Sequence, residues 1–277
     1  MKKRSHGSTS SRRRPAPRDV VRTFYVVGLL VAALVLYVLV VGPFLLVAGV
    51  TFDRTRRIAR RTAQAVYAPL LRHFCRLAGF PLKVELPVDF PSWSEIGPCI
   101  VVANHASSTD VLMLMQLPPG IGDGRIWAKP WPFRKPLLGW LMRLSGHLRV
   151  DNFNLLPDAR DFLEGGETML VFPESSRSRT GKVSRFRDGA FLLAVRTGHP
   201  VIPVAVHGTF ASFPPEQPWI FRPNLRVQVL GILYPDGNDP RSHLVLKQRA
   251  HDMIEAAMSE PSELVHSGGV AMMSGKP

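Results

Sequence analysis

Short apolar runs alternate with segments of helical periodicity between residues 82 and 258. The apolar runs are rich in β-branched residues and predict strands at 82–86, 99–103, 125–128, 148–151, 168–172, 201–206 and 225–230. Helical periodicity covers 110–117, 136–145, 155–164, 189–197 and 242–258. This alternation predicts an α/β fold with a mostly parallel central sheet flanked by helices. In such folds, functional side chains gather beyond the carboxyl ends of the strands.

An uncharged apolar stretch of 27 residues, 24–50, precedes this region. About 20 apolar residues span a bilayer, so the stretch predicts an N-terminal membrane helix or helical hairpin. Basic residues flank it on both sides, and the positive-inside rule therefore does not fix its orientation. Gly42-Pro43 interrupts the stretch. We therefore favour a hairpin that enters one leaflet, with both ends cytoplasmic, over a single span.

Composition divides the chain into four parts. Residues 1–22 carry about +7 of the net charge of +14 and predict a disordered basic tail. Residues 23–64 comprise the membrane segment or hairpin and a basic amphipathic stretch, 65–258 form one domain, and 259–277 form a loose C-terminal tail. The two cysteines, Cys75 and Cys99, provide neither a disulfide framework nor metal-ligand spacing.

The segment NHASSTD, residues 104–110, directly follows a predicted strand. His105 and Asp110 lie five positions apart around a helix start, so their side chains can come within hydrogen-bonding reach. A histidine oriented by a carboxylate can take a proton from a hydroxyl group near neutral pH. The alternative is a capping box from Ser107 to Asp110, in which the carboxylate only caps the helix.

Two basic segments follow later strands. The first, AKPWPFRKPLLGWLMRL, begins at Ala128 and mixes cations with aromatic residues. This mixture is consistent with a site for an anion and an apolar chain, and equally with the solvated face of an amphipathic helix. LVFPESSRSRTG, residues 170–181, places Glu174, Arg177 and neighbouring hydroxyls after a strand. Guanidinium groups match phosphate geometry, whereas the alternative is a solvated basic loop.

The strand predicted at 201–206 contains Pro203, which predicts an edge, a bulge or a position that lines a pocket. His207 follows it and is interpreted as a packing residue. No Gly-x-Ser-x-Gly elbow and no His-x-x-x-His pair occurs in the sequence, and a serine or metal hydrolase is therefore disfavoured.

Taken in order, these segments resemble the four sequence blocks of the glycerolphosphate acyltransferase superfamily. The blocks are Asn104–Asp110, then Lys129 to Gly139 with Gly146 and Val150-Asp151, then Phe172–Ser178, and finally Val201–Val204. The resemblance covers about residues 81–209 and is nearest to the bacterial 1-acylglycerol-3-phosphate acyltransferases.

The resemblance implies a mechanism and a site. His105 is the general base and Asp110 its partner, and the sn-2 hydroxyl of a lysophospholipid attacks the thioester of acyl-CoA or acyl-carrier protein without a covalent acyl-enzyme. Arg177 is expected to meet the acceptor phosphate with assistance from Lys129. The other expected acceptor-binding residues are Glu174, Ser107 and Ser176. No cofactor or metal is implied.

The expected setting is the cytoplasmic face of a bacterial cytoplasmic membrane, where the basic tail would favour anionic lipid over nucleic acid. The sequence departs from the family pattern at Ser175-Ser176, where Gly-Thr is usual. The loss of glycine matters if the backbone there needs a positive φ. Two alternatives stay open: an acyltransferase for another lysolipid, such as a lyso-aminolipid, and a non-enzymatic basic membrane adaptor.

Overall fold

The computed structural model describes residues 14–49, 69–70, 72–79, 82–151, 155–214, 217–221, 224–236, 241–260 and 270–272. Its centre is an eight-stranded sheet in the order β4-β3-β5-β2-β6-β7-β1-β8. The strands are β1 (Leu82–Pro87), β2 (Ile100–Ala103), β3 (Arg125–Ala128), β4 (Leu148–Arg149), β5 (Met169–Val171), β6 (Val201–His207), β7 (Leu225–Val229) and β8 (Val270–Met272).

Five of the seven strand pairs are parallel, and the pairs β6–β7 and β1–β8 are antiparallel. The central strands β2 and β5 consist entirely of buried residues. Near-continuous apolar strands are typical of a parallel sheet that is covered on both faces. The predicted fold class, a mostly parallel sheet flanked by helices, is confirmed.

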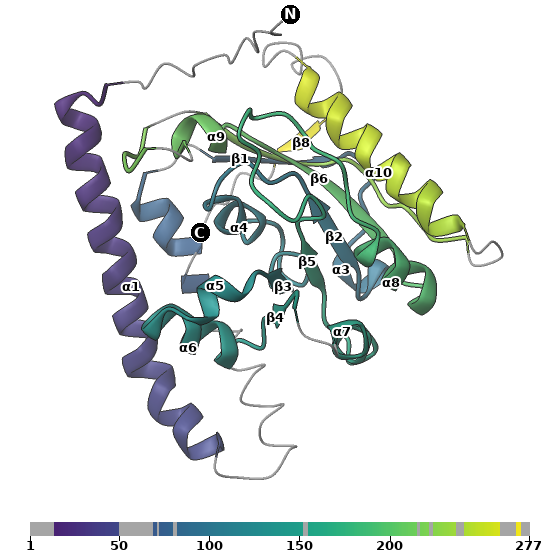
Figure 1. Ribbon diagram of the computed structural model, residues 1–277, viewed down its shortest axis with the longest axis horizontal. Coiled ribbons are helices and arrows are strands. Elements are labelled where there is room, and N and C mark those ends of the chain that lie inside the picture. Colours follow the sequence, from purple (N-terminus) through teal and green to yellow (C-terminus); the bar gives the residue numbers. More distant parts are fainter. Residues whose placement is uncertain are drawn as a thin grey trace, which may run out of the picture.

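Helices cover both faces of the sheet (Figure 1). The longer helices that follow β1 in the sequence are α6 (Pro136–Leu144), α7 (Leu155–Glu164), α8 (Gly189–Thr197) and α10 (Ser242–Ser259). The short helices that lie between the strands are α3 (Trp93–Ile96), α4 (Asp110–Leu114), α5 (Pro130–Phe133) and α9 (Thr209–Ser212). One core cluster joins α4 and the long N-terminal helix to the sheet. A second cluster joins α7, α8 and α10 to the other face.

Helix α1 runs without interruption from Pro17 to Gly49 and contains Pro43. Two predictions are therefore wrong. Residues 17–22 are helical rather than part of a disordered tail, because Pro17 suits a first helical position and Asp19 accepts a hydrogen bond from the Ala16 N–H at 3.0 Å. The helix also continues through Gly42-Pro43 instead of turning there. The predicted basic amphipathic stretch after residue 49 lies outside the described residues up to residue 68.

Polar contacts fix α1 along the side of the domain (Figure 1). Thr23 Oγ1 accepts the Ile220 N–H at 2.9 Å, and the Tyr25 hydroxyl donates to the Leu77 carbonyl at 3.0 Å. Tyr37 is buried to 1% exposure. The contacts from residue 23 to residue 37 cover about 21 Å of helix at about 1.5 Å per residue. The helix is therefore packed lengthwise against the domain.

Two further predictions are corrected. Of the three positions predicted for Pro203, the edge strand is excluded, because β6 lies between β2 and β7. The pairing of β6 with β2 includes Pro203, whereas its pairing with β7 begins one residue later, at Val204. The proline carbonyl accepts the Leu230 N–H at 2.9 Å. The C-terminal tail is not uniformly loose, because residues 270–272 form β8 and pair with β1.

Candidate active site

The site lies where two neighbouring parallel strands end. β2 ends at Ala103 and is followed by NHASSTD, and its neighbour β5 ends at Val171 and is followed by FPESSR. Because the strands are parallel, both segments leave the sheet at the same edge. Asn104 fixes the first segment to β6, since its side chain donates to the Val206 carbonyl at 3.0 Å and accepts the Val206 N–H at 2.8 Å.

His105 and Asp110 form a hydrogen-bonded pair. The His105 Nδ1 lies 2.8 Å from Asp110 Oδ2, and the same oxygen accepts the backbone N–H groups of Ala106 at 2.7 Å and Ser107 at 2.8 Å. Asp110 is fully buried, whereas the histidine side chain keeps 19% exposure. A carboxylate that receives two N–H donors favours the tautomer with a proton on Nδ1. The Nε2 atom is then available as a base.

Glu174 holds the backbone of the histidine. Its Oε1 accepts the His105 N–H at 2.8 Å, and its Oε2 accepts the Ser184 N–H at 3.0 Å and a bond from the Ser184 hydroxyl. The Ser178 N–H donates to the His105 carbonyl at 2.7 Å. Residues 174–178 therefore bind both the backbone N–H and the backbone carbonyl of His105. Burial raises the pKa of Glu174, and the hydrogen bonds from Ser184 and His105 oppose that shift.

The histidine ring also has an aromatic neighbour. Phe172, the last residue before Pro173, stacks on the imidazole with centroids 4.3 Å apart and an interplanar angle of 23°. This contact and the bond to Asp110 leave the ring little rotational freedom. The base is therefore held in position before any substrate binds, as efficient proton transfer requires.

Ser175 is in the left-handed region, with φ of +61°. No other residue except glycine has a positive φ in the part of the chain that the structure describes. The backbone at this position therefore has the conformation for which glycine is the usual residue. Ser175 and Ser176 are both exposed and line the cavity described next.

A cavity of about 730 Å³ begins at His105 and is largely apolar. Its walls come from α1, β3, α6 and β5, and they include Leu30, Ala33, Leu34, Tyr37, Ile126, Trp127, Leu138, Met142 and Val171. Polar side chains line the same cavity, namely His105, Ser108, Lys129, Ser175, Ser176, Arg177 and Arg187. An apolar pocket with a few convergent polar groups is the usual form of a small-molecule site.

Most of the predicted site residues come together here. His105, Lys129, Ser176 and Arg177 all line the cavity, with Asp110 and Glu174 behind the histidine. Ser107 does not line it: this serine is fully buried, and its hydroxyl bonds Thr109 Oγ1 at 3.0 Å and the Phe213 carbonyl at 3.3 Å.

Sequence reasoning missed three contributors to the cavity. Ser108, not Ser107, faces it and accepts a hydrogen bond from Arg177 at 2.8 Å. Arg187 lines it from the loop before α8, and α1 supplies one wall. Arg187 is one of several cations that follow FPESSR in the sequence, and no feature of the sequence sets it apart from the others. Nothing in the apolar pattern of α1 distinguished a cavity wall from a membrane-facing surface.

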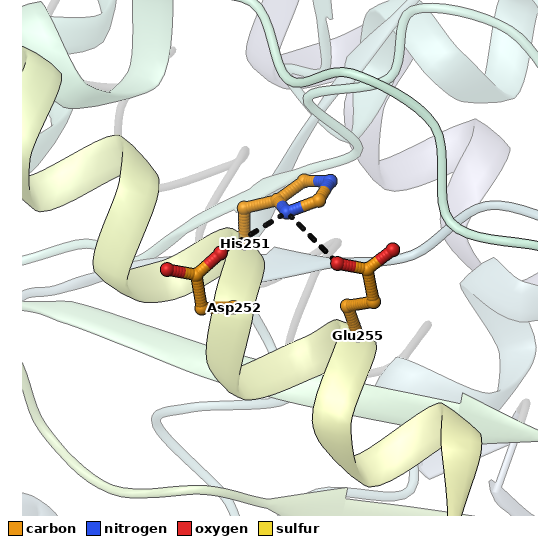
Figure 2. Close-up of side chains that lie close together, drawn as sticks. All are labelled: His251, Asp252 and Glu255. Atoms are coloured by element: carbon orange, nitrogen blue, oxygen red, sulfur yellow. Dashed lines mark ion pairs between the residues drawn. The ribbon is translucent and has the colours of Figure 1, made fainter.

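One group on α10 has the composition of a metal site. The Nδ1 of His251 lies 3.6 Å from Asp252 Oδ1 and 3.8 Å from Glu255 Oε2 (Figure 2). The two carboxylates are 60% and 59% exposed, and the imidazole packs edge-on against Phe186 at 4.9 Å. Such spacing is common on the solvated face of a helix. The group lies on a different element from the histidine–aspartate pair and takes no part in the cavity.

A buried carboxylate that orients a histidine at the mouth of an apolar cavity is typical of an α/β enzyme that activates a hydroxyl group. Comparison with known proteins agrees with this class. Residues 83–207, which contain all four sequence blocks, match the family model described as Acyltransferase. These residues thus match the acyltransferase family, in agreement with the resemblance of the four blocks to the glycerolphosphate acyltransferase superfamily.

Several relatives carry the name 1-acyl-sn-glycerol-3-phosphate acyltransferase. The chain is 30% identical to the chloroplastic protein BAT2 of Brassica napus over 66% of its own length and 52% of that protein. It is 30% identical to a protein of Chlamydomonas reinhardtii over 83% and 65%, and 26% identical to one of Pseudomonas aeruginosa over 73% and 81%. The chain thus spans between about half and two thirds of the first two relatives.

A solved structure supports the fold. The crystal structure of the 1-acyl-sn-glycerophosphate acyltransferase of Thermotoga maritima aligns with a TM-score of 0.67 at 24% identity. The alignment covers 89% of this chain and 98% of the other. The agreement extends over nearly the whole of that protein.

Proposed function

We propose that this protein transfers an acyl group from acyl-CoA or acyl-carrier protein to the sn-2 hydroxyl of 1-acylglycerol-3-phosphate and forms phosphatidate. The observation that carries the proposal is the His105–Asp110 pair, 2.8 Å apart, at the polar mouth of the apolar cavity. The names of the relatives support the same acceptor. The carrier thioester is a co-substrate, and the reaction uses no cofactor or metal.

The chemistry follows from the position of the base. His105 Nε2 takes the proton of the acceptor hydroxyl, and the oxygen forms a bond to the thioester carbonyl carbon. The tetrahedral intermediate then collapses, the carbon–sulfur bond breaks, and the thiolate leaves with the proton that the imidazolium returns. Asp110 stabilises the transient imidazolium through the Nδ1 proton. Both carboxylate oxygens of Glu174 accept hydrogen bonds from backbone N–H groups, so Glu174 positions His105 and does not bind substrate directly.

The cationic side chains at the mouth suit the acceptor phosphate. Arg177 is exposed, and its guanidinium already bonds Ser108 close to the base. Its fork matches a phosphate group, with Lys129 as a second positive charge and Ser176 as a hydroxyl donor. Ser107, which is buried, supports the turn that carries the histidine.

The outer face of α1 suits a membrane interface. The part of the helix from Pro17 to Tyr37 meets the length and hydropathy requirements for a membrane span, and only 17% of its apolar segment is buried. Its large apolar side chains, such as Phe24 and Leu39, are exposed, yet its inner face packs against the domain from Thr23 to the buried Tyr37, over about 21 Å. A helix packed in this way fits a position in one leaflet better than a span across the bilayer. The catalytic domain would lie on the cytoplasmic face of a bacterial cytoplasmic membrane, where the basic charge attracts anionic lipid.

A second acceptor is a lysolipid without a phosphate monoester, such as a lyso-aminolipid. The feature that favours it is the pair Ser175-Ser176, which adds one hydroxyl group, that of Ser175, at the cavity mouth where the family pattern has glycine and threonine. The two acceptors differ in their need for Arg177. Only the first presents a phosphate monoester to the guanidinium.

An acyl-transfer assay of the full chain against a panel of lysolipids, with both donors, separates these readings. Wild-type protein is expected to prefer 1-acylglycerol-3-phosphate. The substitution Arg177→Ala should raise the KM for that acceptor about tenfold and leave a phosphate-free acceptor within twofold. The matched control is Arg179→Ala, which removes the same charge from a residue that does not line the cavity. Equal losses with every acceptor would contradict the role of Arg177, and no transfer to any lysolipid would contradict the proposed function.

A further inference from the structure

A second, polar cleft of about 360 Å³ adjoins the apolar cavity. The two share Ser176 and Arg187 as lining residues, so they are neighbours at the mouth of the site. The rest of the cleft is formed mainly by residues 184–188, which lead into α8. It is hydrophilic where the larger cavity is apolar.

The charges in this cleft favour an anion. Its two acids are already engaged: Glu174 accepts bonds from Ser184 and the His105 N–H, and Asp188 forms an ion pair with Lys247 at 2.6 Å. Arg185 and Arg187 are exposed, and within the described part of the chain neither guanidinium forms an ion pair. Three cations, Arg185, Arg187 and Lys247, thus face the two carboxylates of Glu174 and Asp188, and the cleft keeps a positive charge.

The cleft also lies away from the apolar helix. Asp188 and its partner Lys247 connect the cleft to α10, and α8 and α10 are on the opposite side of the sheet domain from α1 (Figure 1). A lipid acceptor would approach from the α1 side, where the exposed surface is apolar. A water-soluble reactant has access from the side of α8 and α10.

The proposed reaction has one such reactant. An acyl thioester carries its acyl chain on a phosphopantetheine arm, which bears a phosphate group whether the carrier is coenzyme A or a carrier protein. When the acceptor oxygen bonds the carbonyl carbon and the carbon–sulfur bond breaks, the arm leaves as the free thiol with the proton from His105. With the acyl chain in the apolar cavity, the arm needs a polar path away from the base, and the adjoining cleft provides one.

We propose that this cleft binds the phosphate of the donor's phosphopantetheine arm through Arg185 and Arg187. The inference rests on the proposed acyl transfer and assigns a site to its donor. Arg177 serves the acceptor instead, because it lines the apolar cavity and not the second cleft. Separate basic sites keep two phosphate-bearing substrates apart while their reacting groups meet at His105.

The test compares Arg185→Ala with Arg179→Ala in the full chain. Arg185 lines only the second cleft and forms no side-chain hydrogen bond or ion pair with the described residues, while Arg179 lines neither cavity. Arg185→Ala is expected to raise the KM for the donor roughly three- to tenfold, with the KM for the acceptor and kcat within twofold. Arg185→Glu should raise it further, and added salt should reduce the difference. Arg179→Ala should match the wild type.

Acyl-CoA and acyl-carrier protein are assayed separately. A raised KM with both points to the phosphate that the arms share, and a raised KM with one alone supports the site and identifies the carrier that uses it. An unchanged KM with both donors, or a rise confined to the acceptor, overturns the inference. Direct binding of free coenzyme A to each variant is measured as well. A wild type that transfers nothing contradicts the proposed function, whereas a wild type that uses acyl-CoA but binds free coenzyme A no better than Arg185→Glu does contradicts this inference independently.

Discussion

Ser175→Gly should stabilise the protein, although most substitutions in a functional loop do the opposite. The residue has φ of +61°, where a side chain beyond Cα costs about 1–2 kcal/mol. Glycine removes that cost but gives the unfolded chain more freedom, which offsets about 0.5–1 kcal/mol. The expected net gain in the free energy of unfolding is therefore about 0.5–1 kcal/mol.

Ser176→Gly is the matched control at the next position. Ser176 is also an exposed serine, but it does not lie in the left-handed region. Only the entropic penalty applies there, so this variant should lose about 0.5–1 kcal/mol. The same chemical change is thus expected to have opposite signs at adjacent residues.

Thermal unfolding of the two variants beside the wild type measures the difference. A change of 1 kcal/mol shifts Tm by about 2–4 °C in a protein near this size, so the two variants should differ by about 2–8 °C. A Ser175→Gly protein that melts below the wild type, or together with Ser176→Gly, would refute the expected gain in stability. Either result would mean that the backbone at residue 175 does not hold a positive φ.

Three other variants test separate parts of the structure. Asp110→Asn should lower kcat on the order of 10³-fold with KM nearly unchanged, because an amide cannot fix the histidine tautomer while it accepts two N–H groups; steady-state kinetics measure this. Gly139→Ala should lower Tm by several degrees, because its Cβ would lie 2.1 Å from the Phe133 carbonyl oxygen. Burial and the charge of Arg226 lower the pKa of His207 to about 4. As the pH drops from about 6.5 towards 4, the unfolded chain binds a proton at His207 before the folded protein does, and the free energy of unfolding therefore falls. His207→Gln should lessen this fall by up to about 1.4 kcal/mol per pH unit, as measured by denaturant titrations.

The centre of the sheet could be predicted because its inner strands, β2, β5 and β6, are short and almost wholly apolar. The strand at Arg125–Ala128 and the helix at Leu155–Glu164 have the predicted bounds. β8 could not be predicted, since three residues in a tail rich in glycine and serine become a strand only by pairing with β1, far away in the sequence. The start of α1 was not predicted, because the basic composition of residues 1–22 indicated disorder. The hydrogen bond that Asp19 accepts at the first turn of the helix does not follow from composition.

The chemistry of the site could be predicted from the sequence, but which side chains face the cavity could not. The spacing of His105 and Asp110 around a helix start was enough to predict their contact, which the structure has at 2.8 Å. Which of two adjacent serines faces the cavity depends on how the turn packs against Phe213, and the sequence contains no signal for that contact. The same holds for Glu174, whose partners, the His105 N–H and Ser184, become neighbours only in the folded sheet.

The most direct test of the account is the rate of thiol release by purified full-length protein with a long-chain acyl-CoA and 1-acylglycerol-3-phosphate, for the wild type and His105→Ala. Loss of the general base should reduce kcat by about 10²- to 10⁴-fold. The Tm of the variant should stay within a few degrees, since the ring keeps 19% exposure and Glu174 and Ser178 bind the backbone of residue 105. A folded His105→Ala protein that still transfers acyl groups within tenfold of the wild-type rate would contradict the central claim.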